Sequence, residues 1–214
     1  MSKKGEQTRQ RIVEQALALF EQRGYAETTL RDIADAAGVS IGLAYRYFRR
    51  KEELVLVLYT QLSEEVARRA KLPEGSVGMR WAALERTRFK VLGPHRRTLL
   101  ALVQVALDPE GELGVLSPAT APVRERWREL HHAVVAGASG ASVAVEPLAR
   151  VLYAIDLLLV IYWMQDTSSG GRQTREAIDR IAKLVDAVAL LPGVGGVIAE
   201  LAGTFQSLVK KEKS

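Results

Sequence analysis

The chain has no cysteine, few aromatic residues and no hydrophobic run long enough to span a membrane. The absence of cysteine excludes disulfides, thiolate metal ligands, cysteine nucleophiles and thiol redox sensing together. The longest unbroken apolar run is Leu157–Met164, whereas a spanning helix needs about 20 apolar residues. The first ten residues, MSKKGEQTRQ, are polar and lack the apolar segment of a signal peptide. We therefore expect a cytoplasmic protein without a membrane partner.

The composition is that of a chain that builds a hydrophobic core. Of its 214 residues, 48% are hydrophobic and 26% are charged. Thirty Lys and Arg residues against 25 Asp and Glu residues leave a net charge of +5, which permits a nucleic-acid partner without requiring one. Apolar residues recur with helical spacing along most of the chain, and alternating stretches are few. The pattern predicts an all-α protein.

The N-terminal region predicts two helices in close succession. Thr8 is the predicted N-cap of the first helix, which reaches Arg23, and residues 1–7 are predicted to be a frayed basic tail. A second, shorter helix begins near Thr29. Thr29 and Asp32 have the spacing of a capping box, with Asp in place of the usual Glu.

A tight turn and a third short helix follow at once. The turn Ala-Gly-Val-Ser at residues 37–40 combines a glycine that accepts a positive φ with a serine that caps the next helix. The predicted helix at 41–48 carries aromatic and cationic side chains together, namely Tyr45, Arg46 and Tyr47. This order of helices predicts a helix-turn-helix module, whose third helix fits a DNA major groove.

The rest of the chain is predicted to form a larger helical domain. The predicted helices are 51–70, 77–92, 94–107, 119–137, 146–167, 172–191 and 194–210. Because the helix at 51–70 serves both parts, we place the domain boundary on it, between domains 1–52 and 53–214.

Residues Thr8–Leu54 resemble the TetR family of bacterial transcriptional regulators. The matching pattern is "A..LF...GY..TT...IA..AGVS.G..Y.YF..KEEL", which is spread over this whole stretch. The resemblance implies an all-α fold, in which a three-helix DNA-binding domain precedes a ligand-binding and dimerisation domain. It also implies two copies of the helix-turn-helix on two DNA half-sites, and so a palindromic operator.

The resemblance implies a set of DNA-contacting residues. They lie at the start of the second helix, along the third helix and at the start of the fourth, and are Thr28, Thr29, Ser40, Ile41, Gly42, Leu43, Tyr45, Arg46, Tyr47 and Lys51. The threonines, Tyr47 and Lys51 are expected on phosphates. Since positions 41 and 43 are apolar here, Arg46 is the best candidate for a guanine contact. Arg50 adds positive charge beside them.

Regulators of this kind sense a small molecule, and the aromatic residues of the second domain suggest a mainly apolar ligand. The predicted pocket residues are Trp81, Phe89, Leu102, Trp127, His131, Asp156 and Trp163. Asp156 lies within the most apolar helix and needs a partner there. We expect that partner to be an arginine of a second subunit, a cationic ligand or water. The resemblance assigns the homodimer interface to the helices near 146–167 and 172–191.

These observations predict a homodimeric repressor that leaves its operator when a small ligand binds. An activator, or a regulator controlled by a protein partner, remains the alternative. The chain shows no nucleophile grouping and no phosphate-binding glycine loop after a strand, so we expect neither an enzyme nor a cofactor. We also expect no metal site, because adjacent His131 and His132 point about 100° apart on a helix.

Overall fold

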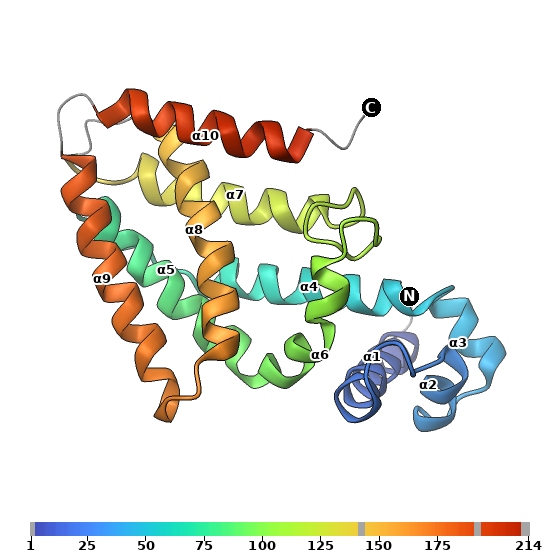
Figure 1. The fold of residues 1–214 in the computed structure, drawn as a ribbon. Coiled ribbons are helices and arrows are strands. Elements are labelled where there is room, and N and C mark those ends of the chain that lie inside the picture. Colours follow the sequence, from blue (N-terminus) through green and yellow to red (C-terminus); the bar gives the residue numbers. More distant parts are fainter. Residues whose placement is uncertain (1–2, 141–143, 191–193, 211–214) are drawn as a thin grey trace. The chain divides into compact units, whose positions relative to one another are not determined.

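The computed structural model describes residues 3–140, 144–190 and 194–210, with side chains described as far as residue 204. These residues form α-helices joined by turns and two short 3₁₀ helices, and no strand occurs among them. The all-α prediction is confirmed. The elements are α1 (Lys3–Arg23), α2 (Leu30–Ala36), α3 (Ile41–Tyr47), α4 (Lys51–Arg69), α5 (Val77–Leu92), η1 (Gly93–His95), α6 (Arg96–Leu107), α7 (Ala121–Ala136), α8 (Val145–Gln165), η2 (Ser169–Gly171), α9 (Arg172–Ala189) and α10 (Val194–Lys210) (Figure 1).

The chain packs into two compact units that alternate along the sequence. Unit 1 consists of residues 1–63 and 93–124, and unit 2 consists of residues 64–92 and 125–214. The two units divide on α4, which is also the helix on which the sequence places the domain boundary. However, α6 returns to unit 1, so packing does not follow a single cut along the chain. The functional division into 1–52 and 53–214 stays a prediction.

Unit 1 is built on one apolar stripe of α1. The side chains of Ile12, Ala16 and Phe20 are fully buried, as the helical spacing predicts. This helix packs against α2 and α6, and α2 packs against α3. The prediction that α1 begins at Thr8 is wrong, because the helix begins at Lys3. The hydroxyl of Thr8 instead donates to the carbonyl of Lys4 within the helix.

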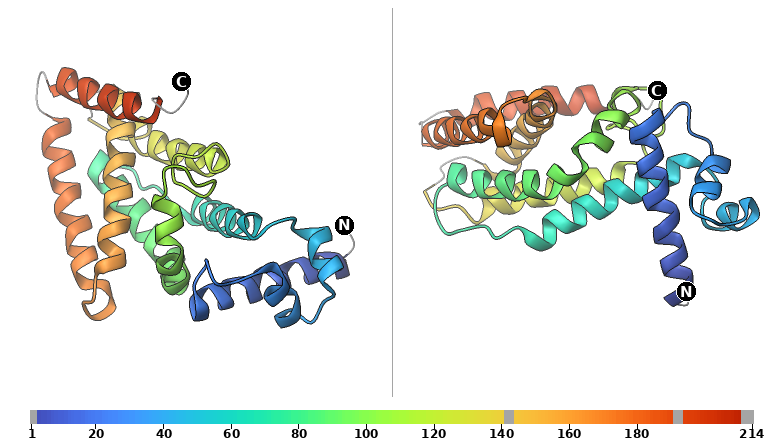
Figure 2. Two further views of the ribbon diagram at one scale, coloured as in Figure 1. Left: turned by 45° about the vertical axis from the view of Figure 1, so that its right-hand side comes forward. Right: turned by 90° about the horizontal axis from the view of Figure 1, so that it is seen from below.

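Unit 2 is held by a long contact between α5 and α9, while α10 packs across α8 (Figures 1 and 2). Gly78 allows the close approach of α5 to α9, because a Cβ at this position would collide with the carbonyl oxygen of Ala182. Asp186 of α9 then accepts hydrogen bonds from the Gly78 N–H at 2.6 Å and the Ser76 hydroxyl at 2.7 Å. The start of α5 is therefore fixed to α9 by both packing and hydrogen bonds.

Helix α8 is the most apolar long helix of the described chain. By length and composition it could cross a membrane, with a mean hydropathy of 1.6 over its most apolar window. The core helix of a globular domain passes the same test, and α8 packs against α9 and α10. It also carries Asp156, which is fully buried. Only a third of its most apolar stretch is buried, so α8 is partly covered by the described chain and leaves apolar side chains exposed.

Candidate nucleic-acid interface and buried polar cluster

The turn between α2 and α3 has the local chemistry that the sequence predicts. The Thr29 hydroxyl accepts the Asp32 N–H, and the Asp32 carboxylate accepts the Thr29 N–H at 2.8 Å, which completes the capping box. Gly38 takes a φ of +62° in the turn. Ser40 caps α3 by accepting the Leu43 N–H at 3.2 Å. Both caps are confirmed: Thr29 sets where α2 begins and Ser40 sets where α3 begins.

Helix α3 exposes one ridge of side chains to solvent. Gly42, Tyr45 and Arg46 are exposed, and their i, i+3, i+4 spacing places them on one face. Tyr45 is 54% exposed, a large fraction for an aromatic residue. On the opposite side Ala44 is fully buried and anchors the helix. This ridge is the part of α3 that a DNA groove can reach.

The other residues predicted on α3 take intermediate positions. Ile41, Leu43 and Tyr47 are half-buried, so they flank the ridge rather than form it. A Cβ added at Gly42 meets no neighbouring atom, which leaves open space in front of the helix at that point.

The paired threonines before α2 face in different directions. Thr28 is fully buried, and its hydroxyl donates to the carbonyl of Gly24 at 2.8 Å. The expected phosphate contact by the Thr28 side chain therefore needs correction, because that side chain is enclosed by protein. Thr29 is exposed, but its hydroxyl donates to the Asp32 carboxylate and accepts the Asp32 N–H.

Lys51 is used inside the protein. Its ammonium group donates to the carbonyl oxygens of Tyr25, Ala26 and Thr28 at 2.7, 3.2 and 3.1 Å. It also lies 4.2 Å from the centre of the Tyr25 ring. An ammonium has three donors, so all of them are occupied by the connector between α1 and α2. In the described chain Lys51 thus positions this connector, and its expected phosphate contact stays a prediction.

Two further groups fix the start of α4. The Tyr25 hydroxyl donates to Glu52 at 2.6 Å, and burial together with this acidic partner raises the pKa of Tyr25. Arg50 donates to Glu112, which hydrogen-bonds to it at 2.6 Å and raises the pKa of Arg50. Arg50 is therefore paired with a carboxylate rather than left free toward DNA. Glu112 gives no local signal in the sequence, since it lies in the connector after α6.

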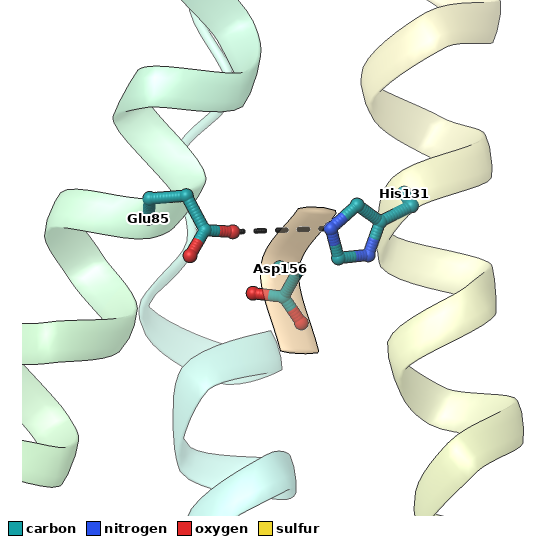
Figure 3. Close-up of side chains that lie close together, drawn as sticks. All are labelled: Glu85, His131 and Asp156. Carbon is teal, nitrogen blue, oxygen red and sulfur yellow. Dashed lines mark ion pairs between the residues drawn. The ribbon is translucent and has the colours of Figure 1, made fainter. Parts of the chain in front are cut away.

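Unit 2 contains a buried polar cluster formed by Glu85, Arg88, His131 and Asp156. These residues come from α5, α7 and α8, and each side chain is at most 6% exposed. The Glu85 Oε1 atom lies 3.8 Å from His131 Nε2, and Asp156 projects toward the same point (Figure 3). Arg88 Nη1 contacts Oδ1 of Asp156 and lies 3.5 Å from Oε2 of Glu85.

Burial changes the titration of this cluster. It raises the pKa of Glu85 to about 7, although the nearby Arg88 opposes the shift. It lowers the pKa of His131 to about 4, because the imidazolium form is poorly solvated there. His131 is therefore neutral at pH 7. Since the Trp127 carbonyl can only accept, the 2.8 Å contact to Nδ1 places the proton of the ring on Nδ1.

The structure brings some of the predicted pocket residues together. Trp127, His131 and Asp156 meet around Arg88, whose guanidinium carbon lies 4.3 Å from the centre of the Trp127 ring. Phe89 and Trp163 stack with ring centres 5.3 Å apart. Trp81 is fully buried on α5, four residues before Glu85.

One predicted pocket residue lies elsewhere. Leu102 belongs to α6 and therefore to unit 1. Two surface hollows of unit 2, at α7–α8 and beside α9, are lined by other residues, most of them charged or polar.

The partner of Asp156 is Arg88 of the same chain, which corrects the expectation of an arginine from a second subunit, a ligand or water. Sequence reasoning missed both Glu85 and Arg88. A signal for them exists, because they occupy the same helical face as the buried Trp81 and Leu84. A charged pair at core positions of an amphipathic helix points to a buried polar cluster.

A capped helix-turn-helix followed by a larger helical unit defines a class of DNA-binding regulators. The family model "Bacterial regulatory proteins, tetR family" matches residues 12–58, and "Tetracyclin repressor-like, C-terminal domain" matches residues 81–198. The second match alone covers more than half of the chain. The chain therefore belongs to the TetR family of bacterial transcriptional regulators.

Curated relatives match only in part. The transcriptional regulator AcrR of Shigella flexneri is 32% identical over 53% of this chain and 56% of its own length. The transcriptional repressor KstR2 of Mycobacterium tuberculosis is 50% identical over 21% of this chain and 22% of its own. The chain thus aligns with about half or less of these relatives.

Solved structures support the fold over a longer range. A TetR-family regulator from Syntrophomonas wolfei has a TM-score of 0.70, with 21% identity over 88% of this chain and 98% of that one. At this identity the likeness shows the fold alone.

Proposed function

We propose that the chain is a cytoplasmic, homodimeric repressor that binds a palindromic operator through α3 and leaves it when a small, mainly apolar ligand binds unit 2. The observation that carries the DNA-binding part is the exposed ridge of Gly42, Tyr45 and Arg46 on a helix that is capped at its start and anchored behind. The repressor assignment is supported by the name of the transcriptional repressor KstR2, a relative that is 50% identical over 44 residues. An activator that uses the same ridge remains the alternative.

The roles within the ridge follow from the side chains. Arg46 can donate two hydrogen bonds to a guanine edge, and Tyr45 offers an aromatic face to a thymine methyl or a hydroxyl to a phosphate. Thr29 and Tyr47, at the border of the ridge, suit phosphate contacts. Ile41 and Leu43 are half-buried and offer only apolar contact. Lys51 contributes through the connector that it holds.

The dimer is assigned to α8 and α9. In the single chain these helices leave large apolar side chains exposed, including Leu158 at 66% and Leu184 at 64%. Ile161, Tyr162 and Val188 extend this exposed apolar surface. Large exposed apolar side chains at helical spacing on two helices support an interface there. A dimer that buries it presents two copies of α3, as a two-half-site operator requires.

Release by a ligand needs a route between α5 and the DNA-binding helices. Helix α6 follows α5 directly through η1 and packs on α1. Thr98 of α6 donates to Glu21 of α1, which adds a polar link to this contact. A ligand that favours one position of α5 can therefore bias α1, provided that its affinity differs between the two states.

The test is fluorescence anisotropy of the full chain with the DNA upstream of its own gene and with random DNA, at about 150 mM salt. A sequence-specific regulator should prefer the first DNA by about 10³-fold or more. Arg46→Ala should reduce this preference, with binding to random DNA nearly unchanged.

The matched control is Arg126→Ala, which removes an exposed arginine of α7 in unit 2. It should leave the preference intact. Equal losses on both DNAs for Arg46→Ala would overturn its role in base reading. Absence of binding to either DNA at low salt would overturn the DNA-binding assignment.

A further inference from the structure

Two hydrogen-bond acceptors face each other inside unit 2. His131 donates from Nδ1 to the Trp127 carbonyl, so Nε2 carries a lone pair. This atom points at Oε1 of Glu85, 3.8 Å away, and neither atom has a hydrogen-bond partner (Figure 3). Both residues are fully buried. Two buried acceptors left in this way are costly unless a positive group lies between them.

The cluster also contains more carboxyl groups than cationic side chains. The two carboxyl groups of Glu85 and Asp156 face the single guanidinium group of Arg88. Arg88 engages Oε2 of Glu85 and Oδ1 of Asp156. It therefore leaves Oε1 of Glu85 on the side that faces His131. On that side, Oε1 of Glu85 and Nε2 of His131 can both bind a positively charged group, and neither atom has a hydrogen-bond partner.

The spacing of the donor atoms is close to that of a metal site. One donor atom from each of Glu85, His131 and Asp156 lies within 4.8 Å of the other two. Tetrahedral zinc with bonds of about 2.1 Å places its ligand atoms about 3.4 Å apart. The 3.8 Å between Glu85 Oε1 and His131 Nε2 is near this value. Small rotations of the three side chains would reduce the other donor-atom distances, which are within 4.8 Å, to about 3.4 Å.

We propose that Glu85, His131 and Asp156 bind one divalent transition-metal ion of the zinc type. The donor set of one imidazole and two carboxylates suits such an ion. The hydrogen bond from Nδ1 to a backbone carbonyl is the outer contact by which a metal-bound histidine is commonly oriented. Arg88 holds the outer carboxylate oxygens and positions them. The metal site is independent of the proposed DNA binding, because its three ligands belong to unit 2 and the residues of the α3 ridge belong to unit 1.

The expectation of no metal site rested on His131 and His132 alone. Those two side chains do diverge, since His131 is buried and His132 is exposed. The partners that make His131 a ligand come from α5 and α8, at positions 85 and 156. Proximity of this kind arises only in the folded chain.

The experiment uses the full, untagged chain, stripped with a chelator and titrated with Co²⁺ under visible spectroscopy, then with Zn²⁺ as competitor. We expect one Co²⁺ per chain with visible d–d bands, and displacement by Zn²⁺. His131→Gln and Glu85→Gln should each weaken Co²⁺ binding by more than about tenfold, since loss of even an outer contact has that effect.

His132→Gln is the matched control, because it changes an exposed histidine on the same helix. It should leave the spectrum and stoichiometry unchanged. Helicity by circular dichroism, measured without metal, checks that each variant folds. If His131→Gln does not fold, Glu85→Gln, which keeps the shape of its side chain, carries the test alone.

A second readout is the thermal midpoint. Zn²⁺ should raise the midpoint of the unaltered chain and leave that of Glu85→Gln unchanged. No Co²⁺ binding, or binding that survives in a folded Glu85→Gln variant, overturns the site. A proton shared by Glu85 and His131 would then be the group that lies between them.

Discussion

The DNA-binding face and the buried cluster treat their polar groups in opposite ways. Around α3 the polar groups satisfy one another: Ser40 caps the helix, Thr28 bonds to Gly24, and Lys51 holds three carbonyls. The ridge is thereby left on a rigid support. In unit 2, Glu85 and His131 present buried acceptors without partners. The contrast shows that the residues around α3 are hydrogen-bonded before DNA binds. The buried cluster instead leaves two acceptors that a positive group would satisfy.

Replacing Arg88, the cationic side chain of the buried cluster, should have the largest effect on stability. Arg88→Met leaves Glu85 and Asp156 as buried carboxylates without a counter-charge, and should lower the free energy of unfolding by about 3–5 kcal/mol. The measurement is urea unfolding followed by circular dichroism. Arg50→Met breaks the exposed pair with Glu112 and should lower the free energy of unfolding far less, because solvent screens an exposed pair.

Adding Asp156→Asn to Arg88→Met should restore part of the loss, because one uncompensated charge disappears. Equal costs for Arg88→Met and Arg50→Met would remove the distinction between the two regions.

Two glycines should respond to the same substitution with opposite signs. Gly78→Ala forces a methyl group against the backbone of α9 and should destabilise the chain by about 1–3 kcal/mol. Gly42→Ala adds a methyl group in open space on a helix, and should stabilise by up to about 1 kcal/mol. Thermal and urea unfolding measure both. The operator affinity of Gly42→Ala should nevertheless fall, because the methyl group lies on the ridge.

Lys51→Met tests whether this lysine positions the connector or contacts DNA. Loss of three hydrogen bonds should lower the free energy of unfolding by about 1–2 kcal/mol. Operator affinity should fall, while the slope of log K against log salt stays the same, because no phosphate contact is lost. A slope smaller by about 1 would instead show a direct phosphate contact.

Two capping carboxylates should differ in their acid dependence. Hydrogen bonds from Thr29 lower the pKa of Asp32 in unit 1. Burial alone would raise the pKa of Asp166 in unit 2, but hydrogen bonds from Ser168 and Thr174 outweigh it and lower that pKa. A lowered carboxyl pKa stabilises the fold above the unfolded value of 3.8, and this stabilisation is lost as the pH falls through the folded value.

Asp166→Asn should therefore be less stable than the unaltered chain at neutral pH, and the difference should shrink as the solution is acidified. Asp32→Asn should show the same trend with a smaller amplitude, since Asp32 is partly exposed and Asp166 is 3% exposed. Thermal midpoints across the acid range measure both variants. A constant difference for Asp166→Asn would contradict the assignment.

The sequence predicts well those structural features that depend on residues close together along the chain. The caps at Thr29 and Ser40, the turn at Gly38 and the helix that follows depend on residues a few positions apart, and all are confirmed. The start of α1 was wrong, because Thr8 bonds back to Lys4 inside a helix rather than capping one. Local propensity does not distinguish these two uses of threonine.

Long-range partners could not be predicted in the same way. The Glu112 partner of Arg50 and the Arg88 partner of Asp156 come from segments that only folding brings near. For Lys51 nothing in the sequence indicates that the carbonyls of the α1–α2 connector occupy its donors. The buried pair Glu85 and Arg88 was missed as well, although its placement on the apolar face of α5 is visible in the sequence.

The alternation of the two units has a consequence for synthesis. Chains emerge from the ribosome with the N-terminus first, and domains generally fold as they emerge. Here residues 1–63 must wait for residues 93–124, which bring α6 to α1, before unit 1 is complete. The segment 64–92 meanwhile waits for α7 to α10. A nascent chain of this protein therefore carries both units unfinished for a time, and a fragment that ends after the helix-turn-helix lacks part of the core on which α1 rests.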